Sequence, residues 1–86
     1  MSELSKLSNI GDALEKRLND VGIHNSHQLF KSGSKAAFVR LHQIDETACF
    51  SMLCALEGAI RGIRWHSLPD EIKSDLKLFH KTLSNK

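Results

Sequence analysis

One segment constrains the fold more than any other, an apolar stretch in the second half of the chain. Between Ala48 and Ile63, apolar residues occupy almost every side of a helical projection, and charges enter only at Glu57 and Arg61. A helix that is apolar nearly all round is one that other elements enclose. We therefore expect a buried central helix from Ala48 to Ile63, with the rest of the chain packed around it.

The remaining apolar residues also recur at helical spacing, and the alternating pattern of β-strands is missing from the sequence. The fold class that we expect is all-α, a compact arrangement of five helices. Start and stop signals give the other four. They are a helix over Asp12–Asp20 that Gly22 ends, a helix over Ser26–Ser32 that Gly33 ends, a helix that Ser34 caps, and a last helix that begins at Pro69.

Two glycines interrupt the central helix, Gly58 and Gly62. Each costs helix stability, about 0.5 to 1 kcal/mol relative to alanine. Their expected use is to let another backbone approach closely, so we predict that both sit at a helix crossing.

Length and charge set broad limits. The chain has 86 residues and a net charge of +2, which fits a single domain over residues 1–86 with a short lead at 1–6 and a tail at 84–86. No run reaches the roughly 18 to 20 apolar residues that cross a bilayer, and Met1–Lys6 lacks the apolar stretch of a secretory signal. We expect a cytoplasmic protein, whose charge permits DNA binding without arguing for it.

Candidate residues for catalysis or metal binding are scattered. The five histidines fall on different predicted elements, so we expect no metal site and no cofactor. Cys49 and Cys54, five residues apart, match no zinc spacing and are expected to be buried thiols. No nucleophile has a recognisable base beside it, so the chain is not expected to be an enzyme.

A glycine-containing turn precedes the first predicted helix, at Asn9, Ile10 and Gly11. Such a turn can present backbone amides to a phosphate, which is how helix-hairpin-helix modules bind DNA. Asn9 stands where that motif usually has a glycine or proline, and Asp12 places a negative charge at the phosphate position. The alternative is a turn that serves packing.

A second candidate surface lies where the central helix ends. Two arginines flank Gly62 and lead into a tryptophan, a combination that can engage a partner, although the tryptophan could instead plug the edge of the core. Lysines four residues apart follow on the last helix as a basic stripe, which is more often a solvated face. The candidate partner surface consists of Arg61, Arg64, Trp65, His66, Lys73, Lys77 and Lys81.

The fifteen residues from Ala55 to Pro69, ALEGAIRGIRWHSLP, closely resemble the C-terminal domain of the TfoX/Sxy family, and the likeness extends from about Leu7 to Leu83. The resemblance implies a compact helical domain with helix-hairpin-helix (SAM-like) character. It also implies a role in bacterial DNA-transformation competence, beside the catabolite-activated regulator of DNA-uptake genes. Full-length family members carry another domain before this one, and Met1–Lys6 is only a short lead, so we expect a standalone relative.

Three functions remain open. The leading hypothesis is a non-enzymatic regulatory or adaptor module that acts in transcription regulation, mainly by protein contact. The first alternative is weak, sequence-independent DNA binding through the Asn9–Gly11 turn and the lysine stripe. The second is a homodimerising structural module that shares part of the central helix between two chains.

Overall fold

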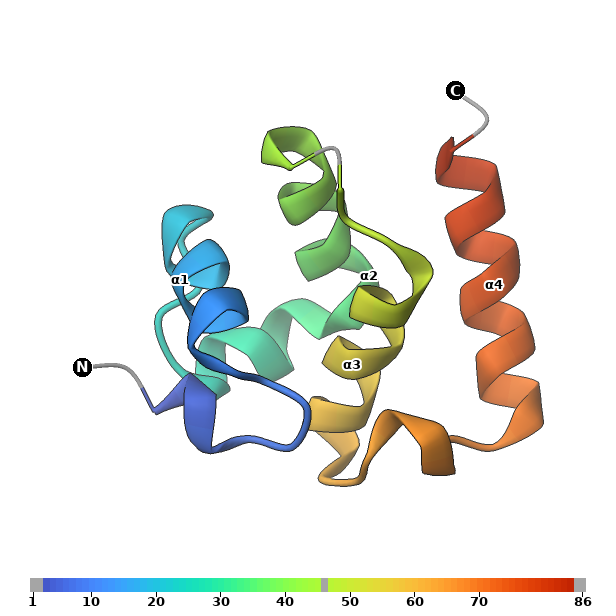
Figure 1. Ribbon diagram of the computed structural model, residues 1–86, viewed down its shortest axis with the longest axis horizontal. Helices are drawn as coiled ribbons and strands as arrows, with labels where there is room; N and C mark the ends of the chain where they lie inside the picture. The colour runs from blue at the N-terminus through green and yellow to red at the C-terminus, as the bar shows by residue number, and fades with distance from the viewer. Residues whose placement is uncertain (1–2, 46, 85–86) are drawn as a thin grey trace.

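The computed structural model describes residues 3–45 and 47–84, and these residues form helices and turns only (Figure 1). Four α-helices and two single turns of 3-10 helix follow one another along the described chain. In order they are η1 (Leu4–Lys6), α1 (Asp12–Asp20), α2 (Ser26–Ile44), α3 (Phe50–Arg61), η2 (Trp65–Ser67) and α4 (Asp70–Ser84).

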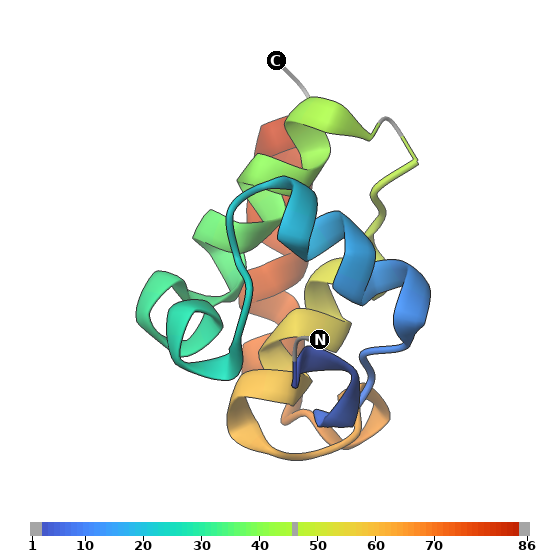
Figure 2. The same ribbon diagram turned by 90° about the vertical axis from the view of Figure 1, so that its left-hand side faces the viewer.

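Helix α3 is the centre of the fold. It packs against both α2 and α4, while α1 and α4 lie on opposite sides of it (Figures 1 and 2). The prediction of a buried central helix is confirmed, although its bounds are shorter than expected. Its most buried side chains include Leu53, Cys54, Leu56 and Ala59.

Helix α1 has the bounds that the sequence predicts, and Gly22 ends it as expected. Gly22 takes a left-handed conformation, with φ of 87°. Its N–H donates to the Asn19 carbonyl (3.1 Å), and the Ile23 N–H donates to the Leu18 carbonyl (2.8 Å). These bonds satisfy carbonyls that the end of a helix leaves unpaired.

The two helices expected on either side of Gly33 form one kinked element, α2, so the predicted count of five helices is not confirmed. Gly33 has φ of 82° and ψ of 161°, angles outside the helical region. The start of α2 matches the prediction, since the Gln28 N–H donates to the Asn25 side chain (2.9 Å). Ser34 does not act as the predicted cap, because its hydroxyl lies buried and donates to Glu57 (2.6 Å).

The hydrogen bond from Ser34 to Glu57 joins α2 to α3 inside the fold. Burial by itself would raise the pKa of Glu57, but hydrogen bonds from Ser34 and Arg61, with the positive charges of Arg61 and Lys35, lower it below its ordinary value. The carboxylate stays ionised and acts as a fixed acceptor between the two helices.

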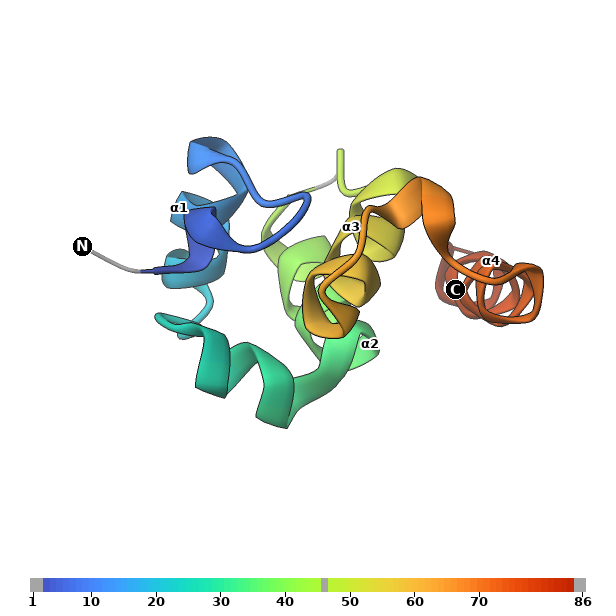
Figure 3. The same cartoon turned by 90° about the horizontal axis from the view of Figure 1, so that it is seen from below.

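Helix α4 begins at Asp70, and Pro69 immediately before it accepts the first helical hydrogen bond, from the Lys73 N–H (3.0 Å). The helix packs on one face only, and Leu76 is its most buried residue at 1% exposure. Leu78 on the other face is 65% exposed. Figure 3 shows α4 end-on at the edge of the molecule, with α3 between it and α1.

The two cysteines differ in their surroundings. Cys54 is buried in the core, and burial raises the pKa of its thiol. Cys49, at the start of α3, is exposed, so the expectation that both thiols are buried is wrong for Cys49. The position just before a helix faces solvent here because α3 begins two residues later than predicted.

Replacing Gly62 by valine should lower the free energy of unfolding by about 2 kcal/mol, because a β-branched residue is strained in the left-handed region. Gly62 has φ of 74°, and a Cβ added there would meet no atom within 4 Å. The cause is thus backbone conformation and not the helix crossing that the sequence predicted. Thermal unfolding should rank Gly62→Asn above Gly62→Val in stability, because asparagine tolerates this region better. Equal stability of wild type and Gly62→Val would contradict this explanation.

Candidate protein-interaction site

The candidate site is the corner that the chain makes where α3 ends. Gly62 terminates the helix, its N–H donating to Ala59 (3.3 Å) and the Ile63 N–H donating to Gly58 (2.9 Å). Arg64 is then extended, with φ of −69° and ψ of 143°, and η2 carries the chain toward α4. A left-handed cap followed by an extended residue reverses the chain within a few residues.

Asn9 holds this corner from the N-terminal part of the chain. It is the one residue other than glycine, within the described ranges, that has a positive φ, 71°. Its side-chain nitrogen donates to the Ile63 carbonyl (2.9 Å) and the Ala55 carbonyl (3.4 Å). Its side-chain oxygen accepts from the Trp65 N–H (3.1 Å). One amide therefore bonds to α3, to the linker that follows it and to the first residue of η2; we call this arrangement the Asn9 clamp.

Gly58 makes room for the Asn9 clamp. A Cβ at this position would lie 2.5 Å from the Asn9 side-chain nitrogen, 2.7 Å from the Ile63 carbonyl oxygen and 3.2 Å from the Trp65 nitrogen. The prediction of a close approach at Gly58 is confirmed, but the approaching groups are an asparagine side chain and the returning chain, not a crossing helix.

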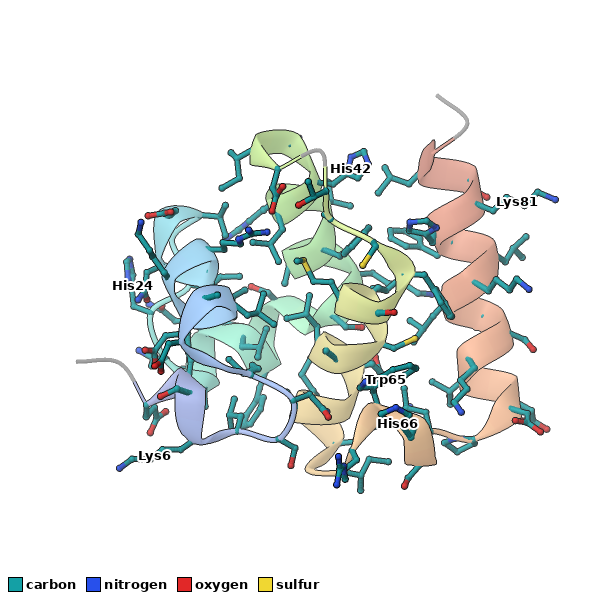
Figure 4. The ribbon with its side chains drawn as sticks, in the orientation of Figure 1. Lys6, His24, His42, Trp65, His66 and Lys81 are labelled. Carbon is teal, nitrogen blue, oxygen red and sulfur yellow. The ribbon has the colours of Figure 1, made fainter. Side chains whose placement is uncertain are left out.

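The clamp fixes the backbone from which the corner side chains project. Arg64 and His66 are exposed, and Trp65 is partly buried. The Trp65 and His66 rings stack with centroids 4.0 Å apart and planes 30° apart, and Figure 4 shows the two side chains together at the base of the molecule. The Lys73 ammonium donates to the His66 carbonyl (3.0 Å), which ties η2 to α4.

The structure divides the predicted partner surface into two parts. The corner brings Arg64, Trp65, His66 and Lys73 together, whereas Lys81 lies near the far end of α4 (Figure 4). Arg61 is partly committed, because its guanidinium forms an ion pair with Glu57 one turn earlier on α3. Among the described residues, Arg64 has no ion-pair partner, so its charge is available to another molecule. We call Arg64, Trp65 and His66 the corner site.

The Asn9–Gly11 turn is built differently from a phosphate-binding turn. The Asn9 side chain is bonded within the clamp, the Ile10 side chain is 4% exposed, and the Ile10 N–H donates to the Leu7 carbonyl (3.3 Å). Only Gly11 of the three is exposed. These contacts favour the packing interpretation of the turn, and phosphate contact stays a prediction. The helix-hairpin-helix character is not confirmed, since the element before the turn is the three-residue η1.

A shallow cleft of about 410 Å³, which the sequence does not predict, lies between α1 and the end of α2. Arg17 of α1 forms an ion pair with Asp45 beside it, and the exposed Ile44 contributes to its wall. Nothing in the sequence shows that the end of α2 lies opposite Lys16, Arg17 and Asp20 of α1.

The described residues hold no group of three or more histidine, cysteine or acidic side chains placed to bind a metal ion. His24, His42 and His66 lie in separate regions of the molecule (Figure 4). None of the described helices has the length and apolar character needed to cross a membrane. What the corner can offer chemically is a cation beside a stacked aromatic pair, a combination suited to recognition.

The fold and the site define a class of protein, a small helical module with a partly aromatic corner that the Asn9 clamp holds. The chain belongs to the TfoX C-terminal domain family, whose sequence model matches residues 1–80. The family resemblance expected from Ala55 to Pro69 is thereby confirmed. No curated protein is similar enough in sequence to count as a match.

Two solved structures have the same fold. An uncharacterised protein from Listeria monocytogenes, in a triclinic crystal form, is 48% identical, with a TM-score of 0.93 over 94% of this chain and 92% of that one. A protein of unknown function from the same organism, in a tetragonal form, is 49% identical, with a TM-score of 0.91 over 93% and 98% of the two chains. Neither these relatives nor the family indicates a catalytic activity.

Proposed function

We propose that the chain is a non-enzymatic adaptor in transcription regulation that binds a protein partner through the corner site. Family membership supports the regulatory part of this proposal, because the resemblance to the TfoX/Sxy family implies a role in DNA-transformation competence. The observation that carries the contact itself is Arg64, which is exposed and without an internal ion-pair partner among the described residues, beside the stacked Trp65 and His66.

The energetics of protein interfaces favour this surface over the others. Tryptophan and arginine dominate interface hot spots, because large side chains on a fixed backbone lose little conformational freedom when they bind. The Asn9 clamp fixes the backbone at Trp65 through its N–H. A partner with an acidic group opposite Arg64 and an apolar or aromatic group against the Trp65–His66 stack would complement the corner.

Arg64→Ala should leave the thermal midpoint nearly unchanged and should reduce partner recovery by about tenfold, as expected for removal of a hot-spot side chain. The measurement is a pull-down from the native cytoplasm with the wild-type chain and the variant as baits, with bound proteins quantified by mass spectrometry. A matched control is Lys31→Ala, which removes a positive charge from an exposed position on α2 and should recover the partner at the wild-type level. Recovery of no transcription component, or equal recovery by all three baits, would contradict the proposal.

A further inference from the structure

Helix α4 has a second face that the other described residues, 3–45 and 47–69, leave uncovered. The inner face packs on the core through Ile72, Leu76 and Phe79. Glu71, Ser74, Leu78 and Lys81 are all exposed, and they succeed one another at spacings of three, four and three residues. That is the a and d spacing of a helix seam that packs against another helix. We call these four residues the outer seam.

The outer seam carries its charges at opposite ends. Glu71 lies in the first turn of α4 and Lys81 in the last, with the small Ser74 and the apolar Leu78 between them. In an antiparallel pair of such helices centred on position 76, each Glu71 faces a Lys81 and each Leu78 faces a Ser74. A parallel pair would place like charges opposite each other, which is unfavourable. The seam is therefore complementary to a second copy of itself in one orientation only.

Shape supports the same pairing. Leu78 is the most exposed of the large apolar side chains among the described residues, at 65%. A shallow hollow of about 270 Å³ lies on this face, lined by Ser74, Lys77, Leu78 and Lys81. The small Ser74 side chain leaves room into which the Leu78 of a second copy can pack.

We propose that the chain forms an antiparallel homodimer through the outer seam of α4, related by a two-fold axis near position 76. Such an interface is isologous, with each contact made twice. It differs from the homodimer that the sequence left open as an alternative, because most of the apolar residues of α3 are already buried within one chain. One helix pair with a single large apolar side chain per copy makes a small interface, so the dimer is weak and forms at high protein concentration. The corner site lies outside the seam, so the two proposals can fail separately.

Sedimentation equilibrium of the full chain, from about 10 μM to about 1 mM, tests the dimer directly. We expect a mass that rises with concentration toward twice the monomer mass and an association that weakens as salt is added. Leu78→Glu should abolish the association. Phe30→Glu, at another exposed large apolar position on α2, should leave it intact. A chain that remains monomeric at the highest concentration would overturn the proposal.

Charge reversal distinguishes association through the outer seam from association through any other surface. Lys81→Glu and Glu71→Lys should each weaken association by roughly tenfold, because each turns two attractive pairs into two repulsive ones. The double variant, Glu71→Lys with Lys81→Glu, should restore association. Circular dichroism should confirm that all variants remain helical. Association that is unaffected by the single reversals, or that is not restored in the double variant, would show that the copies meet elsewhere.

Discussion

Asn9→Ala is expected to lower the free energy of unfolding by about 3 kcal/mol. Three hydrogen bonds are lost, each worth about 0.5 to 1.5 kcal/mol net, and alanine in the left-handed region adds roughly 1 kcal/mol. The bonds connect positions 46, 54 and 56 residues apart in the sequence, so no local rearrangement can replace them. Chemical denaturation monitored through Trp65 fluorescence measures the change.

Two further substitutions separate the causes. Asn9→Gly relieves the backbone strain but loses the hydrogen bonds, so it should be more stable than Asn9→Ala by roughly 1 kcal/mol. Asn9→Asp keeps an acceptor for the Trp65 N–H but turns a carboxylate toward the Ile63 carbonyl, and should be destabilised as well. Wild-type stability of Asn9→Ala would mean that the clamp does not hold the corner.

Gly58→Ala should destabilise the fold by about 2 kcal/mol, even though alanine is the better helix former. The added methyl group would lie 2.7 Å from the Ile63 carbonyl oxygen, a backbone atom that cannot rotate away, and 2.5 Å from the Asn9 side chain. For a chain of this length the expected fall in thermal midpoint is about 8 to 16 °C. Ser51→Ala, at an exposed position on the same helix, should change stability by less than about 0.5 kcal/mol.

The Asn9 and Gly58 effects should also be coupled. Once Asn9 is shortened to alanine, the methyl group at position 58 has one neighbour fewer, so Gly58→Ala should cost less in that background. A double-mutant cycle should give an interaction energy of about 1 kcal/mol. Strict additivity would contradict direct contact between the two positions.

The sequence predicted those parts of the fold that depend on local spacing. Apolar residues at helical spacing and the stop signal at Gly22 indicate α1, and the all-round apolar character of α3 indicates its central place. These two predictions agree with the structure because helical periodicity and burial are encoded within one segment. The kinked α2 was divided in two because Gly33 signals a helix end, yet the helical hydrogen bonding resumes immediately beyond it.

The candidate site was less predictable, because its contacts join distant segments. Gly58 and Gly62 look equivalent in the sequence. Gly58 is needed because a side chain approaches it closely, whereas Gly62 is needed because its backbone is left-handed. Sequence alone does not distinguish these two reasons for a glycine. Asn9 looked like a departure from a glycine-containing motif. Asparagine is the residue other than glycine that most readily adopts left-handed angles, and that preference was the signal available for its role.

The Asn9 clamp holds the corner from which Arg64, Trp65 and His66 project, and amide hydrogen exchange at Trp65 is the sharpest test of that role. The Trp65 N–H donates to the Asn9 side chain, so it should exchange slowly in the wild type. In Asn9→Ala it should lose this protection, while core amides of α3 such as that of Leu56 exchange more slowly than Trp65 in both proteins. Fast, unprotected exchange at Trp65 in the wild type would show that Asn9 does not hold the corner.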